Sequence, residues 1–211
     1  GYRVGGSGMG GSAIIEGAFE GHGGGHRFQV DFNIQVPRAL EAARISTDAG
    51  NIVVNGMSGR VDAESSGGNL RMDDIGGAIN AETAGGNIEI GNVGSDLSLR
   101  SGGGNIRIGS AKGKVVTSTG GGRVSIGSGG SAVMVETGGG GIEISKCAGE
   151  LKATTGGGSL ELGDVQGRAL VETGGGSIRL SGAKGMVVAT SGGGSLELLN
   201  LAHGARAENG A

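Results

Sequence analysis

The sequence predicts an all-β protein that forms a single parallel β-solenoid, or β-helix, with 18-residue coils. Three observations support this fold class. An 18-residue motif recurs along most of the chain, apolar and polar residues alternate inside each motif, and 53 of the 211 residues are glycine. A unit of this length is too short to bury its own apolar face, so neighbouring units must stack on one another.

The repeat can be aligned on the residue that follows each glycine corner, which we number position zero. Ten such positions run from Asn33 to Ser195 in steps of 18, with no insertion or deletion. Positions +1 and +3 are apolar in every unit, for example at Ile106 and Ile108, whereas position +2 is mostly polar. A period of two is typical of a β-strand with one buried face.

A second strand is expected at positions +10 to +14. Positions +10 and +12 hold apolar or small residues, and position +13 is often charged, as at Glu136 and Glu172. Between the two strands, position +6 is a mostly apolar column that includes Cys147. We therefore expect positions +1, +3, +6, +10 and +12 to line the core, with Cys147 as a small core residue.

Position +14 holds a small residue with a hydroxyl group in nine successive coils. Its parity with +10 and +12 directs it inward, where a hydroxyl can pair with backbone groups that a tight corner leaves unsatisfied. The members of this predicted hydroxyl ladder are Thr47, Ser65, Thr83, Ser101, Thr119, Thr137, Thr155, Thr173 and Ser191.

Glycine marks two corners of each coil: position +8, and a run of three glycines before most of the zero positions, such as residues 156–158. We expect turns there, because glycine adopts φ > 0 without steric cost or lets neighbouring coils crowd together. Replacing Gly149 or Gly157 by valine should then cost more than about 1 kcal/mol. The +8 glycines are Gly59, Gly77, Gly113, Gly149, Gly167 and Gly185.

The two ends of the chain depart from the repeat. We assign residues 1–32 to an N-terminal segment and hairpin cap, and residues 33–211 to about ten coils. Alternation over 28–36, preceded by apolar residues at 13–15 and a glycine-rich link, predicts a β-hairpin that covers the first coil. The register persists to Asn209, so we expect an open C-terminal end where the natural chain continues or a second molecule stacks.

Composition disfavours several classes of partner. The formal net charge is −3 without a basic block, which argues against nucleic acid. No apolar run approaches the roughly 20 residues of a transmembrane helix, so no transmembrane segment is expected. A single cysteine cannot form an intramolecular disulfide.

Candidate catalytic and metal-binding groups are few. Asp73 and Asp74 form the only adjacent acidic pair, but charges spread one per coil do not combine an acid, a base and a cleft, so we expect no enzyme. The glycine corners lack the aspartates of calcium-binding nonapeptide repeats. His22 and His26 lie in a glycine-rich stretch, where a solvated loop is favoured over a metal site. We expect no cofactor.

The outward columns at +2 and +13 allow two interpretations. Their charges either bind a charged glycan or protein, or they provide solubility and register. Arg71, Glu89 and Arg107 are stacked neighbours of alternating sign, each pair being worth about 0.2–1 kcal/mol. We favour the second interpretation.

The stretches Val30–Pro37 and Ile45–Ile52, followed by reiterated Thr-Gly-Gly-Gly-Ser-Leu-Glu-Leu units, resemble the bacterial adhesin-like Toastrack domain family over about residues 26–211. This sequence has a stricter period and more triple glycines than shorter members. The resemblance implies a secreted or envelope-attached bacterial protein, in some members linked to envelope-stress signalling, and it offers no catalytic residues.

These observations lead us to expect a non-enzymatic structural or adhesive module. Its expected partner is a protein or glycan at the cell surface, or a second copy that meets the open C-terminal edge in a filament. Two alternatives remain: an extracytoplasmic sensor of envelope stress, and an ice-binding solenoid that uses a regular threonine row such as Thr119, Thr137 and Thr155.

Overall fold

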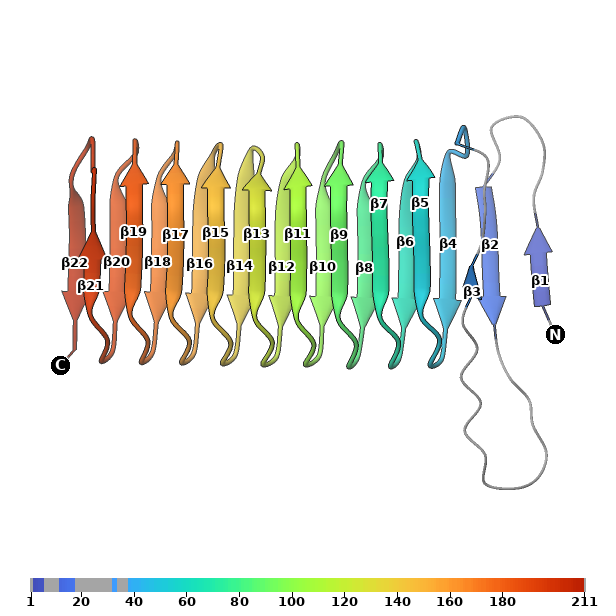
Figure 1. The fold of residues 1–211 in the computed structure, drawn as a ribbon, viewed down its shortest axis with the longest axis horizontal. Coiled ribbons are helices and arrows are strands. Elements are labelled where there is room, and N and C mark those ends of the chain that lie inside the picture. Colours follow the sequence, from blue (N-terminus) through green and yellow to red (C-terminus); the bar gives the residue numbers. More distant parts are fainter. Residues whose placement is uncertain (1, 6–11, 18–31, 34–37, 211) are drawn as a thin grey trace, which may run out of the picture.

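The computed structural model describes residues 2–5, 12–17, 32–33 and 38–210, and the side chains of 38–210. All regular secondary structure in these residues is β-strand. The strands stack as a β-solenoid of about nine turns with about 18 residues per turn, which confirms the predicted fold class (Figure 1). No helix occurs among these residues, and so none that is long and apolar enough to cross a membrane.

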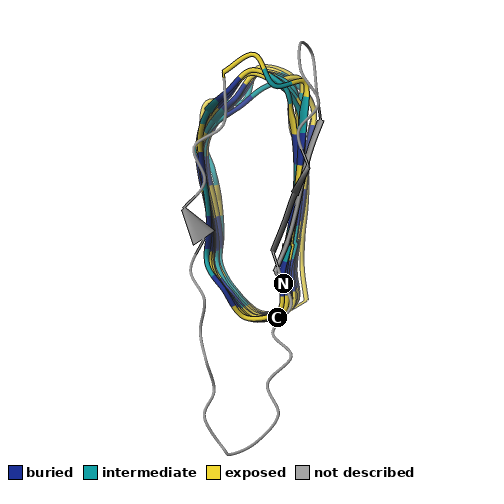
Figure 2. Ribbon diagram, turned by 90° about the vertical axis from the view of Figure 1, so that its right-hand side faces the viewer, coloured by how far each residue is buried: buried dark blue, intermediate teal, exposed yellow. Residues whose placement is uncertain are grey.

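Two sheets form the walls of the solenoid, and Figure 2 shows them facing each other across a flattened ring. The long sheet contains β1 (Tyr2–Gly5), β2 (Ser12–Gly17), β4 (Ala42–Thr47), β6 (Arg60–Ser65), β8 (Ile79–Thr83), β10 (Leu97–Ser101), β12 (Lys114–Thr119), β14 (Ala132–Thr137), β16 (Glu150–Thr155), β18 (Ala169–Thr173), β20 (Val187–Ser191) and β22 (Ala205–Asn209). The short sheet contains β3 (Phe32–Asn33), β5 (Ile52–Met57), β7 (Leu70–Ile75), β9 (Ile88–Val93), β11 (Ile106–Ala111), β13 (Val124–Gly129), β15 (Ile142–Cys147), β17 (Leu160–Val165), β19 (Ile178–Ala183) and β21 (Leu196–Leu198).

From β4 onward, each strand pairs in parallel with the strand 18 residues later, as in Leu97↔Val115. The predicted inward columns are buried in the coils from Ala43 to Ala189, and together they form one continuous core. Fully burying an aliphatic side chain contributes about 1.5–3 kcal/mol, so the stacked columns are the main source of stability. The prediction for positions +1, +3, +6, +10 and +12 is confirmed in these coils.

Glycine is needed at the +8 corner because the backbones of neighbouring coils are crowded there, and not because φ is positive. Among the described glycines, only Gly56 and Gly204 have φ in the left-handed region, so this part of our expectation for position +8 is wrong. A Cβ at any of the six +8 glycines would instead come closer than 3.0 Å to the preceding coil, in most cases to its backbone. The stacking distance of about 4.8 Å leaves no room for a side chain at this corner.

The triple-glycine corner is not uniform. A Cβ on Gly156 or Gly158 would clash with the backbone of the previous coil, whereas a Cβ on Gly157 meets nothing within 4 Å. The middle glycine therefore faces open space, and the expected cost of replacing Gly157 has no steric basis.

The N-terminal hairpin is formed by other strands than we expected. β1 pairs antiparallel with β2, and β2 pairs in parallel with β4 in the long sheet. β3 instead pairs with β5 in the short sheet, so the two segments expected to pair with each other lie in different walls. Most of the alternating stretch at 28–36 lies outside the described residues.

The first step of the repeat is also longer than predicted. Phe32 is the partner of Ile52, a separation of 20 residues, whereas the alignment on Asn33 required 18. Two extra residues precede β4, and an even number preserves which residues face inward. The coil at Asn33 contributes β4 to the long sheet but only the two-residue strand β3 to the short sheet, and the described solenoid has about nine turns where we expected about ten coils.

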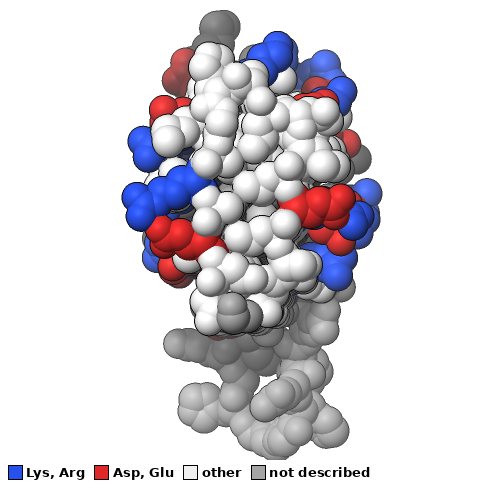
Figure 3. Space-filling view, turned by 90° about the vertical axis from the view of Figure 1, so that its left-hand side faces the viewer, with Lys and Arg blue, Asp and Glu red and all other residues white. Residues whose placement is uncertain are grey.

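β21 and β22 form the last described coil. Leu196, Leu198 and Leu201 are only partly buried there, and all of β22 is exposed, because no further described strand covers it. Figure 3, viewed from this end, shows uncharged atoms in the middle and charged side chains along both flanks.

Candidate functional site

The hydroxyl ladder occupies the inner side of the glycine corner, and all nine of its members are buried. Thr155 Oγ1 accepts a hydrogen bond from the Gly158 N–H at 3.2 Å and donates to the Gly140 carbonyl, one coil back, at 2.8 Å. The same donor and acceptor pattern recurs from Ser65 to Ser191, while Thr47 accepts from Gly50. The threonine row therefore faces the core, and the premise of the ice-binding alternative fails.

A second ladder, of asparagines, escaped the sequence analysis although these residues mark position zero. The Oδ1 atoms of Asn51, Asn69, Asn87 and Asn105 each accept the backbone N–H of the residue 18 positions later, at 2.8 Å. Hydroxyls of Ser159 and Ser177 repeat this contact near the C-terminal end at 3.3 and 3.2 Å. Both ladders join consecutive coils and so contribute to the rigidity of the frame.

The adjacent acids Asp73 and Asp74 form hydrogen bonds and an ion pair within the solenoid. Asp73 Oδ1 accepts the N–H groups of Asn92, at 2.9 Å, and Asp74, at 2.8 Å. Donation by the Asn92 backbone is the main cause that lowers the pKa of Asp73 below its ordinary value. Asp74 has φ 53° and forms an exposed ion pair with Arg38 at 2.7 Å.

The remaining groups considered from the sequence are Cys147 and the two histidines His22 and His26. Cys147 is buried in the +6 column, and burial raises its thiol pKa. His22 and His26 lie outside the described residues. Within residues 38–210 no group of three or more His, Cys, Asp or Glu side chains converges as metal ligands would.

The outer face of the short sheet carries paired charges. Arg71 lies 3.4 Å from Glu89, and Arg179 lies 2.8 Å from Glu197, across neighbouring coils. All four side chains are at least 47% exposed, so each pair contributes little to stability. This face fits the expected role in solubility and register.

The outer face of the long sheet is different, because apolar side chains stack along it. Position +11 holds Val116, Met134, Leu170 and Val188 on successive coils, interrupted by Lys152, and Met186 lies one column aside. Val116, Met134 and Leu170 are 37–39% exposed, and Met186 is 51% exposed. We call Val116, Met134, Leu170, Met186 and Val188 the apolar stripe.

The apolar stripe is confined to β12–β20. The same column holds Arg44, Asp62, Asn80 and Ser98 in earlier coils and Arg206 in the last. Solvation favours polar residues at outward positions, so an exposed apolar row of limited extent is a candidate interaction surface. The sequence analysis missed it, although reading position +11 down the repeat would have revealed it.

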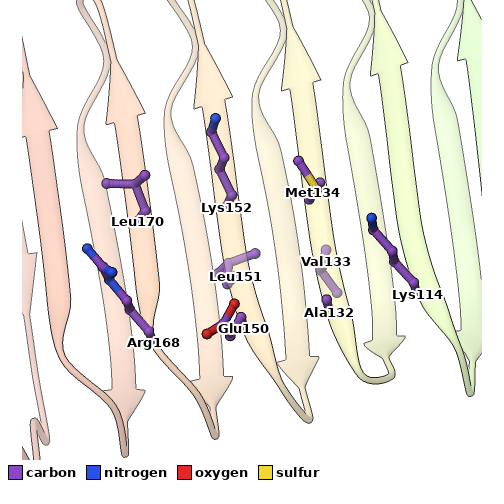
Figure 4. A pocket seen from close by; sticks show the side chains of 9 residues that line it. All are labelled: Lys114, Ala132, Val133, Met134, Glu150, Leu151, Lys152, Arg168 and Leu170. Atoms are coloured by element: carbon purple, nitrogen blue, oxygen red, sulfur yellow. The ribbon is translucent and has the colours of Figure 1, made fainter.

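A hollow of about 380 Å³ lies in the middle of this face. Figure 4 shows its lining in two rows, with Met134, Lys152 and Leu170 in one and Lys114, Ala132, Glu150 and Arg168 in the other. The buried side chains of Val133 and Leu151 complete the lining. The hollow combines an apolar floor with charged edges, as binding sites for partly apolar ligands do.

The charges around the apolar stripe form no ion pairs within residues 38–210. Lys114, Glu150 and Arg168 lie on its +9 side, Lys152 interrupts it, and Glu136 and Glu172 lie on its +13 side. None of the ion pairs within residues 38–210 includes these six side chains, whereas Arg60 and Asp62 on an earlier coil pair at 2.8 Å. Both positive and negative side chains beside the stripe are therefore available to a partner.

No protein-family model, curated protein or solved structure matches the chain.

Proposed function

We propose that this protein is a non-enzymatic structural and adhesive module of a bacterial secreted or cell-surface protein, and that the outer face of the long sheet is its binding surface. The apolar stripe with its unpaired charges is the observation that carries this proposal. Its residues stand on strands whose coils are joined by two side-chain ladders, so the surface is rigid and loses little conformational entropy on binding.

The resemblance to the Toastrack family supports the cellular location in this proposal. It rests on the residue pattern of the chain alone. A spacer or adhesive role also fits a regular rod whose adjacent acids make structural contacts. Asp73 accepts a hydrogen bond from a backbone N–H, and Asp74 forms an ion pair with Arg38.

Binding to glycan arrays and to bacterial surfaces tests the proposal. The variant Met134→Glu/Leu170→Glu places two carboxylates on the apolar stripe, and we expect it to lose most of the binding shown by the wild type. Val53→Glu on the short sheet is the control, because Val53 is also a partly exposed apolar residue on an outer face. Equal binding by all three proteins, or reproducible turnover of a polysaccharide, would contradict the proposal.

A further inference from the structure

We propose that the partner of the apolar stripe is the same face of a second copy of this chain, related by a two-fold axis that lies between β16 and β18 and makes the two solenoids antiparallel. This inference rests on the proposed function, since it names the partner of the same surface. It makes adhesion homotypic, with one solenoid recognising another.

The outer face of β12–β22 is a regular grid, because the strands pair in register. Position +9 reads Lys114, Ala132, Glu150, Arg168, Met186 and Gly204 along the solenoid axis. Position +11 reads Val116, Met134, Lys152, Leu170, Val188 and Arg206, and position +13 reads Ser118, Glu136, Thr154, Glu172, Thr190 and Glu208. Strands lie about 4.8 Å apart, so a second grid of the same spacing matches it coil for coil.

The two-fold axis between β16 and β18 brings complementary groups together. Each coil then faces the coil at the same distance on the other side of the axis. Glu150 faces the partner's Arg168, and Lys152 lies beside the partner's Glu172. Every such contact occurs twice by symmetry, which gives four opposite-charge contacts from side chains that have no ion-pair partner within the described part of one copy.

The same arrangement covers the apolar stripe. Met134 faces the partner's Val188, and Ala132 faces the partner's Met186, the most exposed member of the stripe. The aliphatic part of Lys152 lies over the partner's Leu170 while its ammonium group reaches toward the partner's Glu172. Apolar surface is thus removed from water at the centre of the contact.

Neighbouring arrangements are disfavoured by charge. Moving the axis onto β16 sets Glu150 against the partner's Glu150, and moving it onto β18 sets Arg168 against the partner's Arg168. A parallel pair, with the axis along the stripe, brings Arg168 opposite the partner's Glu172 but also sets Lys152 against the partner's Lys152. It therefore has two opposite-charge contacts and one like-charge contact, compared with four opposite-charge contacts in the antiparallel pair. Like charges placed opposite each other are destabilising, so charge favours the antiparallel register.

The size of the contact predicts a weak, reversible dimer. Six strands about 4.8 Å apart, each presenting about six residues of 3.3 Å, give roughly 600 Å² on each copy and about 1,200 Å² in total. This lies at the lower end of specific interfaces, where weak and transient complexes are common, and we expect a dissociation constant in the micromolar range. Dimerisation should therefore depend on concentration.

Sedimentation velocity over a range of concentrations, with charge-reversal variants, tests the proposal. We expect the wild type to dimerise and Glu150→Arg and Arg168→Glu each to weaken self-association about tenfold or more, because each sets like charges opposite one another. An equimolar mixture of these two single variants should dimerise again, since arginines on one copy then face glutamates on the other. The double variant should also recover.

Two controls keep these outcomes interpretable. Unchanged melting temperatures show that the single variants fold, and Glu143→Arg on the short sheet should leave self-association unaltered. A disulfide-linked dimer formed by Val116→Cys would overturn the antiparallel register, because this register places Val116 opposite the partner's Arg206. Native Cys147 is buried and does not interfere.

Failure of this inference is separable from failure of the proposed function. A wild-type protein that stays monomeric at all concentrations, or variants whose mixture does not recover, would overturn self-pairing. If Met134→Glu/Leu170→Glu still abolished binding to bacterial surfaces in that case, the proposed function would stand with a different partner.

Discussion

Thr155 and Gly158 are joined at the corner of their coil, where the Thr155 hydroxyl accepts the Gly158 N–H and donates to the carbonyl of Gly140 one coil earlier. One side chain thereby satisfies two backbone groups that a tight corner would leave unpaired. The repetition of this contact explains why position +14 is restricted to threonine and serine over nine coils.

Replacing Thr155 by valine should destabilise the protein by about 1–3 kcal/mol, because it keeps the shape and removes both hydrogen bonds. Thr155→Ser should lose much less, since serine fills this position natively at Ser65, Ser101 and Ser191. Denaturant unfolding of the two variants measures the difference. Equal stabilities would show that the hydroxyl does not support the corner.

The adjacent glycines Gly157 and Gly158 should respond in opposite ways to alanine. A Cβ on Gly158 would overlap the backbone of Gly140, whereas one on Gly157 points into open space. We expect Gly158→Ala to cost more than about 1 kcal/mol and Gly157→Ala to stay within about 0.5 kcal/mol of the wild type. Thermal unfolding of this pair checks the crowding argument, and a reversed order would refute it.

Thr117 is a buried residue whose Oγ1 has no hydrogen-bond partner among the described residues. It occupies a +12 position between Leu99 and Val135, where the other coils hold apolar side chains. Thr117→Val keeps the shape and removes the unpaired hydroxyl, so it should stabilise the protein by about 1 kcal/mol. Thr117→Ser, which keeps the hydroxyl and loses a methyl group, should destabilise it. A lower melting temperature for the valine variant would mean that the hydroxyl has a partner.

The buried columns could be predicted because they depend on local information repeated many times. Ile106 and Ile108 show the two-residue period of a strand, and the residues 18 positions away show it again. The pairing of Phe32 with Ile52 could not be predicted, because a single segment outside the repeat carries no such redundancy. The asparagines at positions 33 and 51 suggested that this first step of the repeat also spans 18 residues.

The outer face shows a different limit of sequence reasoning. The period identifies Met134 and Leu170 as outward residues. Whether they form a binding surface depends on which residues share their column and on whether nearby charges are paired. The pairing of the charges is visible only in three dimensions. The reason for the +8 glycines was likewise hidden, since crowding between coils and positive φ both favour glycine.

Cys147 should be unreactive in the folded protein. Burial raises its thiol pKa, and the Sγ atom lies 3.4 Å from the Gly149 carbonyl, inside the core. Since the thiolate is the reactive form, alkylation at neutral pH should be slow in native buffer and fast in denaturant. The rate of labelling under the two conditions checks this, and equally fast labelling would show that the coil opens readily at β15.

The stability contribution of Asp73 should depend on pH. Its carboxylate accepts hydrogen bonds from the backbone N–H groups of Asn92 and Asp74, and these lower its pKa below the ordinary value of 3.8. A carboxyl whose pKa is lower in the folded state stabilises that state at pH above the unfolded pKa and loses this contribution as the pH falls through the folded pKa.

Asp73→Asn keeps an acceptor oxygen but removes the charge, so the wild type should exceed it in stability at neutral pH by a margin that shrinks in acid. Asp73→Ala, which also removes the acceptor, should be less stable than Asp73→Asn throughout. Melting temperatures of the three proteins between neutral pH and pH values below 3.8 measure these differences, and a gap between wild type and Asp73→Asn that stays constant with pH would show that the charge does not act through these hydrogen bonds.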